Sequence, residues 1–104
     1  MHNDENLPYL YVYKITFPNG KIYVGADWGR QAMLNVVSYF GSFKASQEQI
    51  LIDHKEHLKS KTFTITKTIL YETFNQTPAH IRQKEREFIR ALNAKDPKIG
   101  YNKR

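Results

Sequence analysis

The chain has 104 residues, the size of one domain with a modest hydrophobic core. It contains no cysteine, which excludes a disulfide framework and a thiolate metal site and favours a reducing, cytoplasmic compartment. No apolar run is long enough to cross a bilayer, and the polar residues that follow Met1 do not resemble a signal peptide. The net charge of +6 favours a polyanionic partner, and because no segment has the pattern of a membrane-surface helix, we expect nucleic acid.

Residues 1–8 are expected to be an extended or disordered segment, and residues 9–104 to form a single domain. The domain begins with a predicted strand, because the odd positions from Tyr9 to Phe17 all carry large side chains. Pro18-Asn19-Gly20 then predicts a turn. We favour a three-residue loop over a two-residue Asn-Gly turn, because Pro18 suits a type I turn and Gly20 can adopt the left-handed conformation of a bulge.

The length of this loop decides which tyrosines share a face of the hairpin. A three-residue loop pairs Phe17 with Lys21 and Ile15 with Tyr23, which makes Tyr13 and Tyr23 diagonal neighbours on one face. A two-residue loop would place the two tyrosines on opposite faces. The favoured register is compatible with two phenols lining one pocket, and equally with a tyrosine-rich packed face.

Two helices are predicted after the hairpin. The first spans residues 30–40, ends at Gly41, and has an apolar stripe at helical spacing formed by Met33, Val36, Val37 and Phe40. The second follows a candidate N-cap, Ser46, and has its stripe at Ile50, Leu51, His54 and Leu58. His54 and His57 are expected to lie on the solvated surface.

A third strand and a long helix complete the predicted elements. Residues 62–72 alternate apolar side chains with threonines, as is typical of a strand. Thr77 and Pro78 form an N-cap and first-turn pair that begins a helix ending near Asn93. This order of elements predicts an α+β fold with a small three-stranded antiparallel sheet flanked by helices.

A carboxylate interrupts the apolar face of the last predicted helix. Ile81 and Ile89 lie one helical turn on either side of Glu85 and share its face, whereas Glu87 points to the solvated side. A carboxylate on a buried face is unfavourable unless it is paired or holds a cation. Glu85 is therefore either part of a structural ion pair, for which Lys67 on the third strand is a candidate partner, or a metal ligand.

Taken together, these segments resemble the GIY-YIG nuclease family. In chain order, the segments similar to its motifs are Val12-Tyr13-Lys14-Ile15, Tyr23-Val24-Gly25, Glu85 with Ile89, and the closing Gly100-Tyr101-Asn102. The departures are Tyr11 for the glycine and Val12 for the isoleucine of the first motif, and Val24 for the isoleucine of the second. Each motif is weak alone, but the four together, in order over residues 9–102, are fairly specific.

The arginine of this family has no direct counterpart in the chain. Its position falls at Met33, and the arginine nearby is Arg30, which would face inward from the first turn of the predicted helix. The segment Tyr39-Phe40-Gly41-Ser42 is similar to a Tyr-x-Gly-Ser element in a phage-type branch of the family. Lys44, just after this segment, is a second candidate for the cation.

The resemblance implies a metal-dependent DNA endonuclease with low intrinsic sequence specificity. Glu85 would hold one Mg²⁺ or Mn²⁺ ion, Tyr13 or Tyr23 would position and deprotonate the attacking water, Arg30 would clamp a phosphate, and Asn102 would orient the network. The lysines expected to contact DNA are Lys14, Lys21, Lys44 and Lys67, and a targeting protein or a homodimer would supply specificity. The alternatives are a weak or inactive nucleic-acid-binding module of the same fold, and a protein-interaction domain that docks through its tyrosine-rich hairpin.

Overall fold

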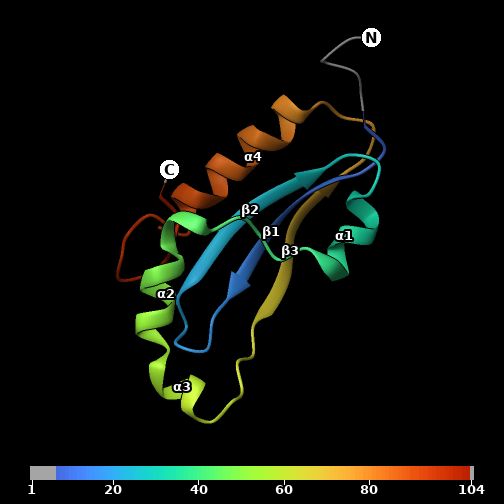
Figure 1. The fold of residues 1–104 in the computed structure, drawn as a ribbon. Coiled ribbons are helices and arrows are strands. Elements are labelled where there is room, and N and C mark those ends of the chain that lie inside the picture. The colour runs from blue at the N-terminus through green and yellow to red at the C-terminus, as the bar shows by residue number, and fades with distance from the viewer. Residues whose placement is uncertain (1–6, 104) are drawn as a thin grey trace.

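The computed structural model describes residues 7–103, so the segment expected over residues 1–8 lies mostly outside the described residues. The described chain forms a three-stranded antiparallel sheet in the order β2-β1-β3 (Figure 1). Its strands are β1 (Leu10–Thr16), β2 (Ile22–Trp28) and β3 (Thr66–Thr73). With the helices that flank this sheet, the structure confirms the predicted α+β fold.

The hairpin of β1 and β2 has the predicted three-residue loop. The Phe17 amide donates to the Lys21 carbonyl at 2.9 Å, and Ile15 pairs with Tyr23. Gly20 has a φ of +88°, the left-handed conformation expected for the bulge. This register places Tyr13 directly opposite Gly25 and keeps Tyr13 and Tyr23 on the same face.

Both faces of the central strand β1 are covered, so its side chains alternate between two hydrophobic clusters. The odd-numbered residues from Tyr9 to Phe17 pack with Ala32, Ile50 and Tyr101 on one face. The even-numbered Leu10 and Val12 pack on the other face with Val24 and with residues of α4 (Pro78–Ala91) and the loop after it, namely Ile81, Ile89 and Ala94. In Figure 1, α4 runs alongside β2.

The first helix, α1 (Ala32–Ser38), presents a face that only partly matches the predicted one. Met33 is 56% exposed and Val37 is 80% exposed. The inward face consists of Ala32, Val36 and the C-cap residue Tyr39, which pack against the odd-numbered face of β1, and of these only Val36 belongs to the predicted stripe. These positions also have helical spacing, so the sequence contains two adjacent apolar stripes, and the prediction followed the larger side chains.

The second predicted helix is divided into a turn and two short helices. These are a 3₁₀ turn η1 (Lys44–Ser46), α2 (Gln47–Asp53) and α3 (Lys55–Lys59). The division falls at His54, which is buried, so the expectation of a solvated histidine is wrong for this residue; His57 is exposed as expected. The His54 ring lies against Phe17 and Phe63, and its Nδ1 is 2.7 Å from the Ile50 carbonyl oxygen.

Helix α4 begins as predicted. Thr77 is its N-cap, and the Thr77 hydroxyl accepts a hydrogen bond from the His80 amide at 3.3 Å, while Pro78 occupies the first turn. Across residues 7–103, no helix combines the length and the apolar composition that a membrane crossing requires.

Candidate active site

A pocket of about 880 Å³ lies beside β2, an edge strand of the sheet. Side chains from β1, β2, the segment between α1 and α2, α4 and the C-terminal segment line this pocket. They include Tyr13, Tyr23, Glu85 and Asn102, which were all predicted site residues, and Lys44. Because β2 is at the edge, groups that belong to opposite faces of the sheet meet around it.

Tyr13 reaches the pocket by crossing the backbone of β2 at Gly25. A Cβ atom at Gly25 would lie 2.4 Å from the Tyr13 hydroxyl oxygen, so this register requires glycine opposite the tyrosine. Burial raises the pKa of Tyr13 above that of a free phenol, and the nearby Tyr39 and Tyr23 raise it further. Tyr13 is therefore a neutral phenol at neutral pH, a group that can donate a hydrogen bond.

Tyr23 is more accessible than Tyr13 and contacts the segment that connects α1 to η1. Its hydroxyl donates to the Ser42 carbonyl oxygen at 3.0 Å, and the Tyr39 hydroxyl lies 2.6 Å from the Ser42 Oγ. Gly41 has a φ of +115°, and a Cβ atom there would lie 2.9 Å from the Tyr23 ring. Residues 39–42 therefore form a wall of the pocket against both motif tyrosines.

Glu85 enters the pocket from α4 and is the one acidic residue among the described residues that line it. It is half-buried, between the buried Ile81 and Ile89, as the helical spacing predicted. The candidate ion pair with Lys67 is not formed, because the Lys67 ammonium donates to the Tyr11 hydroxyl at 2.9 Å, among groups on the opposite face of the sheet from α4. The structure thus brings Glu85 to the same pocket as the two tyrosines.

Arg30 does not line this pocket. It is exposed in the turn after β2, because Gly29 with a φ of +121° redirects the chain and α1 begins only at Ala32. Two arginines of α4, Arg82 and Arg86, line the pocket instead. The spacing that selected Glu85 also selects them, since residues 82, 85, 86 and 89 share one face of a helix.

Asn102 also lines the pocket, but both groups of its amide bind the backbone of β2. The Asn102 Oδ1 accepts from the Val24 amide at 2.8 Å, and its Nδ2 donates to the Val24 carbonyl at 2.8 Å. Ile22 forms a parallel bridge with Gly100, so the closing segment adds to the edge of β2. Asn102 is thus placed to fix a wall of the pocket, and its side chain is already occupied by hydrogen bonds to the strand.

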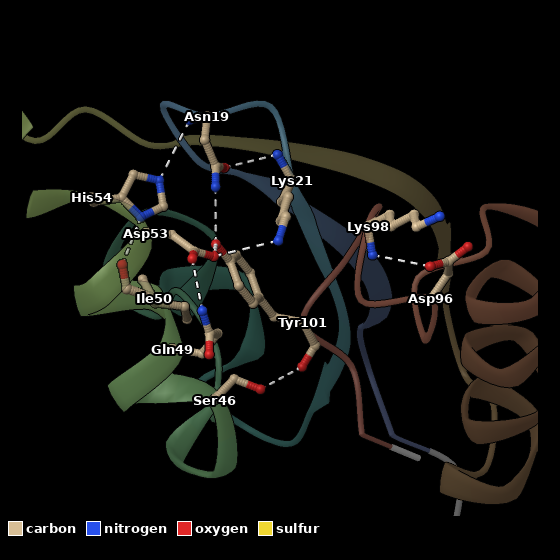
Figure 2. A network of polar contacts seen from close by, with 10 residues as sticks. All are labelled: Asn19, Lys21, Ser46, Gln49, Ile50, Asp53, His54, Asp96, Lys98 and Tyr101. Atoms are coloured by element: carbon tan, nitrogen blue, oxygen red, sulfur yellow. Dashed lines mark hydrogen bonds and ion pairs between the residues drawn. The ribbon is translucent and has the colours of Figure 1, made fainter. Parts of the chain in front are cut away.

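Tyr101 anchors the same segment to the hairpin turn and to α2 (Figure 2). Its hydroxyl donates to the Asp53 Oδ2 at 2.6 Å and accepts from the Asn19 Nδ2 at 3.0 Å. Burial, with a smaller contribution from Asp53, raises the pKa of Tyr101 to about 12. The hydrogen bonds from Tyr101 and then Gln49 lower the pKa of Asp53, although burial opposes this shift.

The four lysines assigned to DNA contact have different surroundings. Lys44 is exposed and lines the pocket. The Lys21 ammonium lies 3.4 Å from the Asp53 carboxylate at the hairpin turn, and Lys67 points inward toward α1. Lys14 is half-buried on β1 and does not line the pocket. Of this group, the structure places Lys44 alone at the candidate site.

The donor groups in the pocket restrict the metals that would fit. Within residues 7–103 there is no cluster of three or more His, Asp or Glu side chains that could enclose an ion. One carboxylate, Glu85, together with phenol oxygens is compatible with Mg²⁺, which keeps several waters and is often bound by one or two carboxylates plus substrate phosphates. The residues thus fit a hydrated ion that shares its coordination with a substrate.

Comparisons of this chain with protein-family models, with curated proteins and with solved structures found no match. The residues of the pocket are therefore what indicates its function. Those residues include two tyrosines from one hairpin, a carboxylate with two arginines from one helix, and a lysine from η1.

Proposed function

We propose that the protein is a metal-dependent DNA endonuclease of the GIY-YIG type with low intrinsic sequence specificity. The observation that carries this proposal is that Tyr13, Tyr23 and Glu85, which come from three separate elements, line one pocket. The pocket also carries Arg82 and Arg86, which provide positive charge for a phosphate.

Phosphodiester hydrolysis needs a positioned water, stabilisation of charge on the phosphate, and assistance to the leaving oxygen. Glu85 would hold a Mg²⁺ or Mn²⁺ ion, which when bound supplies Lewis-acid stabilisation of the scissile phosphate. The Tyr23 hydroxyl, which donates a hydrogen bond to the Ser42 carbonyl oxygen, lines the pocket and would position the attacking water there. Tyr23 would take the proton of this water as a phenolate, a form that a bound metal ion and the pocket arginines would favour and in which the hydrogen bond to Ser42 is given up.

Tyr13 has a different role because its phenol stays protonated. It donates a hydrogen bond toward the phosphate or the water and thereby fixes the reacting groups. Arg86 and Lys44 line the pocket and supply the cations that the resemblance assigned to Arg30. A guanidinium binds two phosphate oxygens at once, which holds the phosphate in one orientation.

A second candidate function is nucleic-acid binding with weak or absent catalysis. The observation that favours it is the position of Arg30 outside the pocket, together with the engagement of the Asn102 amide by Val24. This alternative predicts DNA binding that persists in chelator without cleavage in Mg²⁺ or Mn²⁺.

The test is nicking of supercoiled plasmid with Mg²⁺, with Mn²⁺ and with chelator. We expect cleavage that depends on the metal and is lost in Glu85→Gln. Glu87→Gln is the matched control, because Glu87 is exposed on the same helix and interacts with Lys84 and Gln83 outside the pocket. Equal nicking by wild type and Glu85→Gln would contradict the role of Glu85, and retention of DNA without any nicking would favour the binding module.

A further inference from the structure

The ammonium group of Lys67 lies among three aromatic rings near the motif tyrosines. It is 4.7 Å from the centroid of the Tyr13 ring, 4.8 Å from that of Tyr11 and 5.6 Å from that of Phe40. It donates hydrogen bonds to the Tyr11 hydroxyl, at 2.9 Å, and to the carbonyl oxygens of Asn35 and Tyr39. An ammonium has three N–H donors, so each has an acceptor within the protein.

Two of these acceptors belong to the C-terminal end of α1. Asn35 is in the last turns of this helix, and Tyr39 is its C-cap. The Asn35 carbonyl also accepts the C-cap hydrogen bond from the Tyr39 amide at 2.9 Å, so the Lys67 ammonium shares this acceptor. A helix C-terminus carries partial negative charge, so a cation there is stabilising. The last turn of α1 contains no basic residue. The cation is therefore supplied by β3, from a distant part of the sequence.

The segment that begins at this helix end is the pocket wall described above. The Tyr39 ring packs edge-on against Tyr13, with centroids 6.2 Å apart, and its hydroxyl contacts Ser42. The Ser42 carbonyl in turn accepts the hydrogen bond from Tyr23. Lys67 thus holds one end of residues 39–42, while the other end of this segment contacts Tyr23.

We propose that Lys67 is a positioning residue whose charge holds residues 39–42 in place against Tyr13 and Tyr23. Without the ammonium, the carbonyls of Asn35 and Tyr39 lose their cationic partner, and this wall of the pocket moves away from the tyrosines. The displacement itself does not depend on the proposed function. Its consequence for cleavage does rest on the proposed nuclease activity.

The test is chemical rescue of Lys67→Ala. The substitution removes three methylenes and the ammonium, which n-propylammonium can replace. Amide hydrogen exchange of residues 39–43, followed by mass spectrometry, reports the position of the wall without requiring cleavage. We expect exchange there to be about tenfold faster in Lys67→Ala, because charged hydrogen bonds are lost, and to slow again with n-propylammonium but not with n-propanol.

The controls separate a loss of charge from a loss of packing. Thr68→Ala changes the exposed neighbour of Lys67 on β3 and should leave exchange in residues 39–43 unchanged. Lys67→Met keeps an apolar stem, so it should show the same faster exchange even where the alanine variant is poorly folded. Unchanged exchange in both variants would overturn the proposal, as would equal rescue by propanol or global unfolding of both variants that propylammonium does not reverse.

Plasmid nicking distinguishes this inference from the proposed function. Slower cleavage by Lys67→Ala that n-propylammonium restores would support both. Altered exchange in a protein whose wild type does not cleave would support the positioning role and contradict the nuclease. Normal cleavage with unchanged exchange would contradict the positioning role alone.

Discussion

The phenol of Tyr13 passes over the backbone of Gly25, the residue directly opposite it in the β1–β2 pair. The two motif-like segments of the hairpin are therefore linked physically, because the glycine of the second provides the space that the tyrosine of the first requires. The contact between these two residues lies at the pocket, because Tyr13 and Gly25 both line it.

Gly25→Ala should destabilise the protein, because the new methyl group would overlap the Tyr13 phenol. Overpacking of this kind costs about 1–3 kcal/mol, which urea denaturation measures. The destabilisation should be smaller in a Tyr13→Ala background, where the overlapping ring is absent. An equal effect of Gly25→Ala in both backgrounds would show that the overlap is relieved elsewhere.

Tyr23→Phe should slow plasmid cleavage more than Tyr13→Phe does. Loss of an acid–base group typically reduces the rate by about 10²–10⁴-fold, whereas the buried, protonated Tyr13 contributes a hydrogen bond. Single-turnover rates at saturating metal provide the measurement. Tyr71→Phe is the control, since the Tyr71 hydroxyl interacts with His80 outside the pocket. Normal turnover by Tyr23→Phe would assign the phenol to packing.

Arg86→Gln should weaken DNA binding and cleavage, and Arg30→Gln should not, because Arg86 lines the pocket and Arg30 does not. Loss of one phosphate contact lowers the slope of log K against log salt by about 0.9 for duplex DNA. Binding titrations in chelator at several salt concentrations measure this slope. If Arg30→Gln instead produced the larger loss, the turn after β2 would have to move to the pocket on binding.

The stability of the protein should fall between pH 10 and pH 12. The pKa of Tyr101 is raised to about 12 in the folded state from an ordinary value near 10. Its contribution is therefore fully present below pH 10 and is lost as the pH rises through the folded value. Urea denaturation at increasing pH measures this loss. In Tyr101→Phe the free energy of unfolding should fall less steeply with pH, but it should still fall, because the pKa of Tyr9 is also raised to about 12. An equally steep fall of the unfolding free energy in Tyr101→Phe would contradict the assignment of this loss to Tyr101.

At acid pH the protein should lose stability through Asp53, which accepts the hydrogen bond from Tyr101. Its pKa is lowered in the folded state, so its contribution is present above the ordinary carboxyl pKa and is lost as the pH falls through the lower folded value. Asp53→Asn should therefore lose less stability on acidification than wild type does, when unfolding is followed by circular dichroism. Asp96→Asn, in the C-terminal loop, is the matched control.

Local chemistry in the sequence was sufficient to predict the hairpin and the glutamate. Pro18 and Gly20 determine the loop, the loop determines the register, and the register places the two tyrosines on one face. The helical period similarly placed Glu85 between Ile81 and Ile89 on the inward face of α4. These features depend on residues close together in the chain.

The features that the sequence did not predict depend on distant partners. His54 is buried against Phe17 and Phe63, which come from other elements. Lys67 binds backbone carbonyls of α1, and backbone acceptors have no signature in the sequence. The stripe predicted for α1 shares only Val36 with the inward face, because Ala32, which marks this face, is small and larger apolar residues occupy the adjacent stripe.

The bridge between Ile22 and Gly100 covers part of the edge of β2, which C-terminally truncated forms of the protein would expose. Unpaired strand edges are templates on which other chains assemble, and the C-terminal residues satisfy part of the outer edge of β2. Removing the chain after Ala94 would uncover these backbone groups together with the apolar surface beneath Tyr101. Such a truncated form would self-associate. A loss of function measured with it would therefore result from aggregation and not from the removal of a functional side chain.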